Sequence, residues 1–308
     1  MTMREPENSS INHILLTRFN LPSPGVESLI RAKEGWLRQR VDLFERFCLP
    51  SVAAQTNRNF KWLIYFDPAS PGWLRERIAG HVKDRHYNPV YRETVSNAEM
   101  LGDIRAMIDR EREVLITTNL DNDDGIAVDF VDRVQSVDTR HERAAIYLAN
   151  GLIRRSEGLY LHRYTRNAFN SVRESWSAPV MAWSSWHTEM GDRMPVVEVE
   201  GPPAWLQIVH GSNVSNRVQG RLVAPAEYRR IFGQLLDGVA EPRLIDLGKD
   251  RLISRPARYV RETGRAVGKR VVMGVLGRDG LDRIRLLWRT RLGLRQHLSP
   301  RTAKPPVS

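Results

Sequence analysis

The sequence predicts an α/β protein with a mainly parallel β-sheet flanked by helices. Apolar strand-like segments and amphipathic helix-like segments alternate four times between residues 11 and 137, as in chains built from βα units. Hydrophobic residues make up 41% of the chain and charged residues 27%. This balance is typical of a folded protein and excludes collagen-like, low-complexity and wholly disordered proteins.

Each predicted element has a local justification. The first strand, 11–19, is an apolar run that ends at a segment rich in Pro and Gly. Apolar residues three or four apart predict a helix over 36–56, with a kink or a new turn at Pro50. The remaining expected strands are 60–66, 89–92, 114–120 and 144–148, and the remaining expected helices are 71–83, 98–112 and 130–137. Residues 176–215, rich in Trp, Pro and Gly, predict irregular strands and loops around a pocket.

Charge divides the chain into segments. We expect a disordered N-terminus at 1–10, a folded domain at 11–240 and a basic, partly helical extension at 241–308. The chain carries 47 Lys and Arg against 36 Asp and Glu, a net charge of +11. Residues 241–308 hold 17 basic and 6 acidic residues, so the extension accounts for the whole excess. A nucleic-acid-binding domain normally carries its basic residues on its folded part, so we expect no nucleic-acid partner.

Cysteine content and the N-terminal segment are used to predict the cellular compartment. Cys48 is the only cysteine, so an internal disulfide or a multi-thiolate zinc site is excluded. Its apolar neighbours predict a buried thiol. The polar first ten residues lack a secretory signal, and no apolar run reaches 18 residues. We expect a soluble protein of a reducing cytoplasm.

Acidic residues follow the strand over 114–120. Asp121, Asp123 and Asp124 place three carboxylates within four residues at the end of an apolar run. Such crowding favours a hard divalent cation, which takes one or two carboxylates and shares its other positions with phosphates and water. The alternative is an acidic turn that caps the following helix. In a parallel sheet, Thr17, Arg18, Asp67 and this acidic group should lie along one edge.

Several motifs resemble a known enzyme family. The segments 51–56 (SVAAQT) and 59–67 (NFKWLIYFD), followed by Asp-x-Asp, resemble nucleotide-sugar glycosyltransferases of the GT-A fold, similar to family 2. A closer resemblance, over residues 10–235, is to a bacterial rhamnosyltransferase family. It rests on segments 15–20, 43–50, 117–124 and 205–213. The resemblance implies a GT-A-like, Rossmann-like domain.

The resemblance also implies an activity. It is the metal-dependent, inverting transfer of a sugar, rhamnose according to the family name, from a nucleotide-sugar donor to a glycan or lipid-linked acceptor. Mn²⁺ or Mg²⁺ is the implied cofactor. Two alternatives remain: a non-catalytic module that binds glycan or nucleotide, and a protein that binds nucleic acid through its Arg-rich tail.

Site residues follow from the same resemblance. Asp67 corresponds to the carboxylate that binds the nucleotide base, and Thr17 and Arg18 are expected to touch base or ribose. Asp123 is expected to bind the metal directly, and Asp121 to reach ribose or a metal-bound water. The alternatives are that Asp67 caps the turn at Pro68 and that Arg18 forms a surface ion pair.

Other candidates lie farther along the chain. The resemblance implies that His210, late in the chain, is a ligand of the metal or the diphosphate, although a half-buried loop histidine is equally consistent with its context. Arg105 could approach the diphosphate, or it could be a solvated helical arginine. Trp205 could stack on a sugar ring, or it could belong to the core.

The catalytic base is expected between the Asp-x-Asp motif and His210. Glu189 and Asp192 are the candidates there, because a carboxylate can accept the proton of the attacking hydroxyl. Glu189 is slightly favoured. The usual Glu-Asp pair of the family is absent at this place. His187 is a further candidate because imidazole titrates near neutral pH.

The basic extension contains an amphipathic segment. Residues 281–292 place leucine, isoleucine and Trp288 on one stripe, with arginines largely off it. Such a basic helix is typical of an anionic membrane interface. The sequence therefore predicts peripheral contact with the inner face of the cytoplasmic membrane. The alternatives are that this helix packs on the folded domain or that the tail is loosely ordered.

Overall fold

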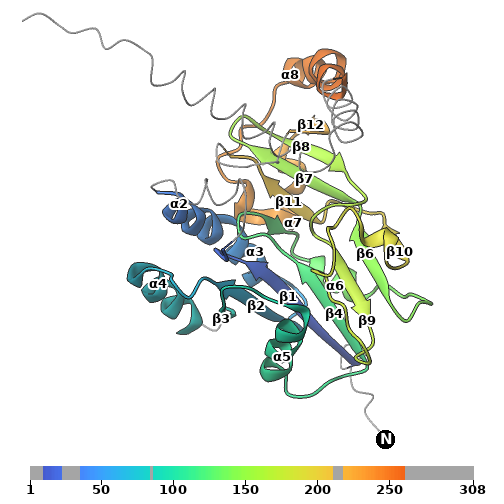
Figure 1. Cartoon of the computed structure of the whole chain (residues 1–308). Coiled ribbons are helices and arrows are strands. Elements are labelled where there is room, and N and C mark those ends of the chain that lie inside the picture. The colour runs from blue at the N-terminus through green and yellow to red at the C-terminus, as the bar shows by residue number, and fades with distance from the viewer. Residues whose placement is uncertain (1–9, 23–34, 84–85, 211–217, 261–308) are drawn as a thin grey trace, which may run out of the picture. The chain divides into compact units, whose positions relative to one another are not determined.

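A seven-stranded sheet forms the centre of the computed structural model, which describes residues 10–22, 35–83, 86–210 and 218–260. The strand order is β10-β6-β9-β4-β1-β2-β3 (Figure 1). These strands are β1 (Ile11–Arg18), β2 (Lys61–Phe66), β3 (Asn88–Tyr91), β4 (Val114–Asn119), β6 (Ala144–Leu148), β9 (Ser171–Glu174) and β10 (Val196–Val199). All neighbours are parallel except β9, which runs antiparallel to both β4 and β6. The prediction of a mainly parallel sheet flanked by helices is confirmed.

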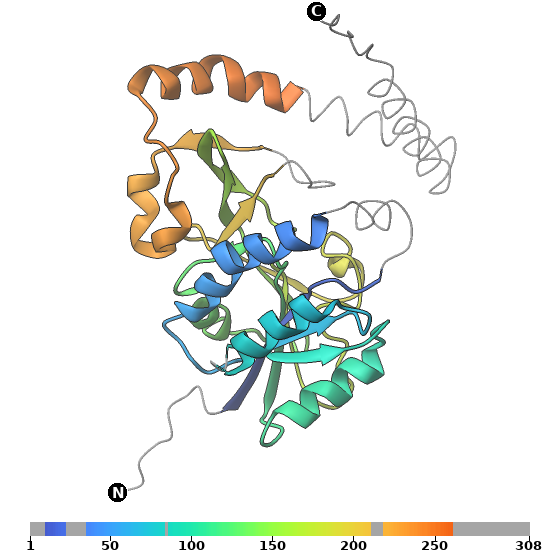
Figure 2. The ribbon, with the colours of Figure 1, turned by 90° about the vertical axis from the view of Figure 1, so that its left-hand side faces the viewer.

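Helices cover both faces of this sheet because its strands are apolar on both sides. The helices are α2 (Trp36–Leu43), the π-helix η2 (Phe44–Cys48), α3 (Leu49–Ala53), α4 (Gly72–Lys83), α5 (Asn97–Met107) and α6 (Phe130–Gln135). Leu15 and Ile64 pack with α2–α4 and α6 on one face, whereas Ile14 and Leu16 pack with α5 on the other. Figure 2 views the molecule from the side on which α2 and α4 lie.

Most predicted boundaries differ from the observed ones for identifiable reasons. The helix predicted over 36–56 ends at Ala53 and widens into the π-helix η2 just before Pro50, whose ring nitrogen has no hydrogen to donate. Helix α5 begins at a capping box between Ser96 and Glu99, and ends at Met107 rather than at 112. Helix α6 is shorter than expected and ends at Gln135.

A second sheet of five strands, which the sequence did not predict as such, lies beside the first. Its order is β12-β8-β7-β11-β5. The strands are β5 (Gly125–Ile126), β7 (Asn150–Arg155), β8 (Gly158–Arg163), β11 (Trp205–Ile208) and β12 (Arg221–Val223). Short helical turns pack near it: η4 (Pro225–Tyr228), α7 (Arg229–Phe232) and η5 (Gly233–Leu236). Strand β11 thereby carries a late part of the chain to β5, just after the acidic motif.

Strand register brings the carboxyl ends of three strands to one edge. Leu16 of β1 pairs with Asn119 of β4, and Arg18 pairs with Tyr65 of β2. The residues that follow these strands, including Asp67 and Asp121, therefore lie along that edge, as parallel-sheet geometry predicts.

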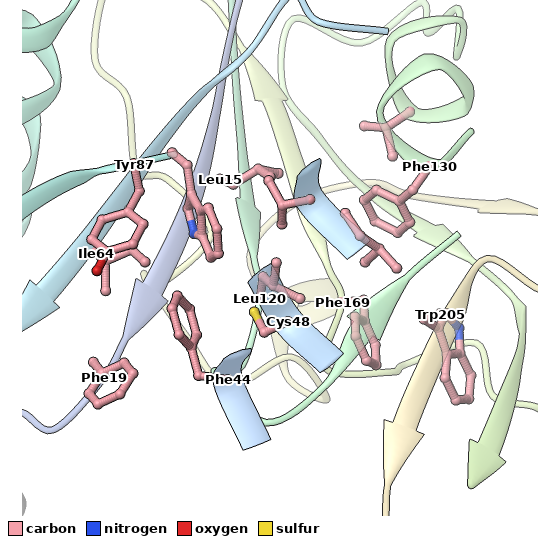
Figure 3. Packing of buried hydrophobic residues seen from close by; sticks show 14 of the residues in the cluster. Leu15, Phe19, Phe44, Cys48, Ile64, Tyr87, Leu120, Phe130, Phe169 and Trp205 are labelled. Atoms are coloured by element: carbon pink, nitrogen blue, oxygen red, sulfur yellow. The ribbon is translucent and has the colours of Figure 1, made fainter. Parts of the chain in front are cut away.

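Cys48 is part of the core. Its side chain is fully buried, and Figure 3 shows its sulfur beside Leu120 and between Phe44 and Phe169. Burial raises the pKa of the thiol well above its ordinary value, and the nearby carboxylates add to the shift. The predicted buried thiol is confirmed.

Beyond residue 240 the chain does not divide where the sequence predicted. The folded unit extends to Arg251, and a second unit comprises 252–308. Val239 is buried, and Asp250 accepts a hydrogen bond from the Leu222 amide, which fixes this stretch to the folded unit. Helix α8 (Leu244–Lys249) continues into the π-helix η6 (Asp250–Ser254), and 255–260 are helical.

Two sequence predictions fall outside the described residues. They are the disordered N-terminus, of which only Ser10 is described, and the amphipathic segment at 281–292. Among the helices of the described ranges, none has both the length and the apolar character needed to cross a bilayer.

Candidate active site

The acidic loop after β4, residues 121–124, is fixed by hydrogen bonds to β1 and β11. Thr17 donates its hydroxyl hydrogen to the Leu120 carbonyl at 2.7 Å, and the Asn122 amide donates to the Phe19 carbonyl at 2.6 Å. On the other side, the Ile208 amide donates to Asp124 Oδ1 at 2.8 Å. These bonds hold the carboxylates at the sheet edge in one arrangement.

Asp123 is where distant parts of the chain meet. Its Oδ2 lies 3.0 Å from His210 Nε2, although 87 residues separate the two in sequence. The same oxygen lies 2.6 Å from Arg40 Nη1, which comes from α2. All three side chains are largely buried, with 7% of Asp123, 10% of His210 and 17% of Arg40 exposed. The structure therefore brings together the two residues for which the sequence predicted direct metal binding.

The three carboxylates differ in their surroundings. Burial opposes ionisation of Asp123, but the His210 hydrogen bond and the Arg40 charge outweigh it and lower the pKa of Asp123. Desolvation and repulsion from Asp123 raise the pKa of Asp121 to about 6, although the residue as a whole is exposed. Burial, with repulsion from both neighbours, raises the pKa of Asp124 well above its ordinary value. The positive charge near the cluster thus lowers the pKa of Asp123 but does not offset the raised pKa values of Asp121 and Asp124.

Three side chains lie on one side of Asp121: those of Asn119, Trp183 and Arg18. Asn119 donates to Asp121 Oδ1 at 3.4 Å and accepts from Trp183 Nε1 at 2.7 Å. The Arg18 guanidinium lies 4.2 Å from the centre of the Trp183 ring, in cation–π contact. This places Arg18 at the edge where the sequence expected it.

The segment that carries Trp183 is held in an uncommon backbone conformation. Met181 is buried and has a φ of 63°, a region that residues other than glycine rarely adopt. The buried Glu174 carboxylate accepts hydrogen bonds from the Val180 and Met181 amides and compensates for this strain. These hydrogen bonds therefore fix the backbone of the segment that carries Trp183.

Asp67 follows β2 at the same edge, as predicted. Its Oδ1 accepts from the Ala69 amide at 2.7 Å, so the carboxylate caps the turn at Pro68. Asp67 is only partly buried, so its side chain also faces solvent at this edge. The capping alternative is therefore observed, and the base contact stays a prediction.

Two predicted site residues, Thr17 and Trp205, have structural roles. Thr17 is fully buried and uses its hydroxyl to bind Leu120 and the Trp62 indole, which leaves no surface for ribose. Trp205 is 2% exposed, donates to the Leu148 carbonyl and stacks on Phe169 (Figure 3). For both residues, the proposed ligand contact is corrected to a packing role.

Arg105 is also corrected. Its guanidinium pairs with Glu111 at 2.6 Å, and Glu111 precedes the start of β4. The acidic loop follows the other end of that six-residue strand, about 20 Å away at the rise of an extended chain. Arg105 is therefore at the opposite edge of the sheet from the carboxylates, as expected for a solvated helical arginine.

The candidate bases lie around the short turn η3 (Met190–Asp192). Glu189 immediately precedes this turn and is half-buried, whereas Asp192 is exposed. The turn is fixed by Met190, which packs with Tyr147 of β6, and by the Tyr147 hydroxyl, which donates to the His187 carbonyl. Burial lowers the pKa of His187 below its ordinary value, so this imidazole is neutral near pH 7. Trp183, six residues before Glu189, links this segment to the acidic loop.

A cavity lies away from the acidic loop. A cavity of about 280 Å³ lies at the amino-terminal edge of the central sheet, lined by Asn12, Lys61 and Arg110 among others. No residue of the acidic loop lines it. The chemistry of the carboxyl edge, rather than the size of this cavity, identifies the site.

Arg40, Asn119 and Trp183 are the site residues that sequence reasoning missed. Asn119 stands next to the acidic motif in the sequence and could have been included. Arg40 and Trp183 carry no local signal, because only the packing of α2 and of the segment after β9 brings them to the loop.

Comparison with known proteins identifies a family. Residues 12–222 match the family described as "Putative rhamnosyl transferase". No curated protein matches the chain. The match covers about two thirds of the 308 residues and contains the acidic loop, Arg40 and His210.

Solved structures give only distant likenesses. S. aureus TarS is 10% identical with a TM-score of 0.38, covering 65% of this chain and 37% of its own. Residues 1–349 of S. aureus TarS in complex with UDP are 11% identical with a TM-score of 0.39, covering 75% and 67%. The T. maritima inositol-1-phosphate CTP transferase is 11% identical with a TM-score of 0.36, covering 74% and 97%. The chain thus spans little more than a third of the full TarS chain.

Family membership rests on the sequence match alone, and it agrees with the motifs, the α/β architecture and the meeting of Asp123 with His210. The chain belongs to the rhamnosyl transferase family and is a glycosyltransferase.

Proposed function

We propose that this glycosyltransferase is metal-dependent and inverting, and that it moves a sugar from a nucleotide-sugar donor to a glycan or lipid-linked acceptor. Rhamnose is the sugar that the family description suggests. The observation that carries the proposal is the contact between Asp123 and His210, two candidate ligands brought together at the carboxyl edge of a parallel sheet. That edge is where ligands bind in sheets of this type.

The residues present fit a divalent cation. Adjacent ligands of an octahedral ion with bonds of about 2.1 Å are about 3.0 Å apart, the separation of Asp123 Oδ2 and His210 Nε2. Asp124 Oδ2 is buried and has no hydrogen-bond partner among the described residues, so an oxygen next to Asp123 is left without a partner. Within those residues no three His, Cys, Asp or Glu side chains form a complete metal site. A diphosphate and water would supply the other ligands.

The chain's own residues bind and orient the donor. Asp123 and His210 would hold the cation, which would supply a Lewis acid for the charge on the departing diphosphate. Arg18, fixed over Trp183, adds positive charge beside Asp121 and reaches towards base or ribose. Asp67, at the end of β2, is proposed to bind the base with the part of its side chain that faces solvent.

Glu189 is the proposed base. Inversion needs one group that accepts the proton of the acceptor hydroxyl while that oxygen attacks the anomeric carbon. Glu189 is half-buried next to a fixed turn, whereas Asp192 is exposed and less constrained. Asp192 and His187 remain alternatives.

Nucleotide release tests the assignment of Asp123. Purified protein is incubated with a panel of nucleotide sugars and either Mn²⁺ or Mg²⁺, and thermal shift identifies the donor that binds. We expect release that EDTA abolishes and that Asp123→Ala lowers by about 100-fold or more, because a metal ligand is lost. The control Asp246→Ala removes a carboxylate paired with Arg243 on α8 and should leave release unchanged.

The same assay separates the alternatives. Undiminished, metal-dependent release by Asp123→Ala would refute the assignment, and donor binding without any turnover would indicate a non-catalytic module. With an acceptor present, we expect Glu189→Gln to lower transfer more than Asp192→Asn or His187→Asn, with donor binding unchanged. A larger effect at either of the other two residues would move the base there.

We also propose that the basic C-terminal extension brings the enzyme to an anionic membrane surface, on the inner face of the cytoplasmic membrane. Residues 252–308 hold 14 Lys and Arg and three Asp and Glu, so this unit alone carries a net +11. Ile245, Leu252 and Tyr259, spaced seven residues apart, are 70%, 76% and 74% exposed. Exposed apolar residues among basic ones support interfacial binding.

A further inference from the structure

Arg40 occupies the position from which a cation would approach Asp123. Its Nη1 lies 2.6 Å from Asp123 Oδ2 and donates to Asn122 Oδ1 at 3.0 Å. The guanidinium also lies 5.4 Å from the centre of the Trp36 ring, one turn earlier on α2. Arg40 is therefore held by a carboxylate, an amide oxygen and an aromatic ring, all within the folded unit.

A bound divalent cation is incompatible with this contact. Asp123 Oδ2 already contacts His210 and Arg40, and the positive guanidinium lies 2.6 Å from the oxygen that a cation would bind. His210 can offer its imidazole nitrogen to a metal, but a guanidinium is always protonated and repels one. Arg40 must therefore leave Asp123 when a cation binds there.

We propose that Arg40 is an internal counter-ion that competes with the divalent cation for Asp123 and couples cation binding to diphosphate binding. This inference rests on the proposed function of the site. Without a ligand, Arg40 neutralises Asp123 among the carboxylates of Asp121 and Asp124. Once displaced, its guanidinium gains a new partner in a diphosphate, which it can bind through two parallel hydrogen bonds.

The competition has a thermodynamic consequence. A free cation has to break a largely buried ion pair, so it binds weakly. A cation that arrives with a diphosphate gives the displaced guanidinium a partner and binds more tightly. Cation and diphosphate therefore enhance each other's binding, by the same factor in each direction. Arg40 is a positioning residue in this scheme and takes no part in bond making.

Cation affinity measured without a donor sugar tests the proposal. Full-length protein is titrated with Mn²⁺, and free Mn²⁺ is followed by electron paramagnetic resonance, with and without UDP or dTDP. We expect Arg40→Met, which keeps an unbranched stem but removes the charge, to bind Mn²⁺ alone about 10-fold more tightly. We also expect the nucleotide to enhance Mn²⁺ binding less in this variant than in the wild type.

Stability provides a second measurement. Arg40→Met should melt at a lower temperature without metal, because Asp123 loses its counter-ion, and Mn²⁺ should restore the melting temperature. Arg105→Met, which removes an exposed arginine at the opposite sheet edge, should behave as the wild type in both measurements. If Arg40→Met does not fold, Arg40→Lys serves instead. Tighter Mn²⁺ binding is expected for this variant because the shorter lysine side chain ends before the Nη1 position that contacts both Asp123 and Asn122.

The outcomes separate this inference from the proposed function. Equal Mn²⁺ affinity in the wild type and the Arg40 variant would overturn the competition, even if donor turnover depends on metal. Mn²⁺ binding by neither protein, with or without nucleotide, would overturn both the competition and the metal dependence.

Discussion

At the scale of single residues, His13 is a buried histidine outside the candidate site. Its Nε2 lies 2.8 Å from the Thr118 hydroxyl, and its Nδ1 lies 3.2 Å from the Gln135 side-chain nitrogen. An amide nitrogen can only donate, so Nδ1 accepts and the imidazole is neutral, with its hydrogen on Nε2. Burial lowers the pKa of His13 from 6.5 to about 3.

Acid should therefore destabilise the protein through His13. Between pH 6.5 and about 3 the unfolded chain binds a proton at this residue and the folded chain does not. The free energy of unfolding then falls as the pH falls, by up to about 1.4 kcal/mol per pH unit. Urea unfolding from pH 7.5 to 4.5 measures this slope. His13→Gln should be less stable at pH 7.5 but should show a shallower slope, and an unchanged slope would contradict the assignment.

Residue-level prediction worked where a side chain is tied to a strand end. Asp67 and Asp123 follow predicted strands, so sheet geometry alone placed them at one edge. His210 came from the resemblance, and the structure brings it to Asp123. Arg40 could not be predicted, because its contact depends on how α2 packs against the loop, which no local pattern encodes.

At the scale of elements, the contact between β7 and β11 depends on a glycine. Gly151 of β7 pairs with Trp205 of β11, and the Trp205 ring covers its Cα, so an added Cβ would overlap the indole. Strand β11 leads directly to His210. The packing of Trp205 therefore supports the site without any contact with a ligand.

Gly151→Ala should lower the free energy of unfolding by about 1–3 kcal/mol, the usual cost of overpacking a buried contact. Urea unfolding measures the change. The matched control is Gly80→Ala on α4, where a Cβ meets no atom within 4 Å. Alanine there should stabilise the helix by up to about 1 kcal/mol. Equal effects in the two variants would show that Trp205 does not pack as described.

Elements were predicted well in the first half of the chain and poorly in the second. The runs that became β1, β2 and β4 are long, apolar and separated by helices, so their pattern is distinctive. The second sheet consists of strands of two to six residues, several on the edge or half-exposed, with partners far apart in sequence. The hairpin of β7 and β8 does place the two polar residues Ser156 and Glu157, followed by Gly158, between two short apolar segments, a turn signal that could have been used.

At the scale of the whole molecule, positive charge is unevenly distributed between the two units of the chain. The unit up to Arg251 holds as many basic as acidic residues, and its acidic loop is the proposed cation site. The unit from 252 onward holds the entire excess of +11. This concentration of positive charge in one segment is what the proposed binding to an anionic membrane depends on.

Binding to vesicles tests this proposal in the full chain. Reversing Arg283, Arg285 and Arg289 to Glu should weaken binding to vesicles with anionic lipid by about 100-fold, because each basic residue near such a surface contributes about 1 kcal/mol. The control reverses three exposed basic residues of the folded unit, Arg58, Lys83 and Arg230, and reaches the same net charge. Co-sedimentation should show strong, salt-sensitive binding for the wild type and the control, since salt screens charge. Equal loss in the two variants would mean that net charge alone matters, and equally tight binding of a nucleic acid duplex would favour a nucleic-acid partner for the extension.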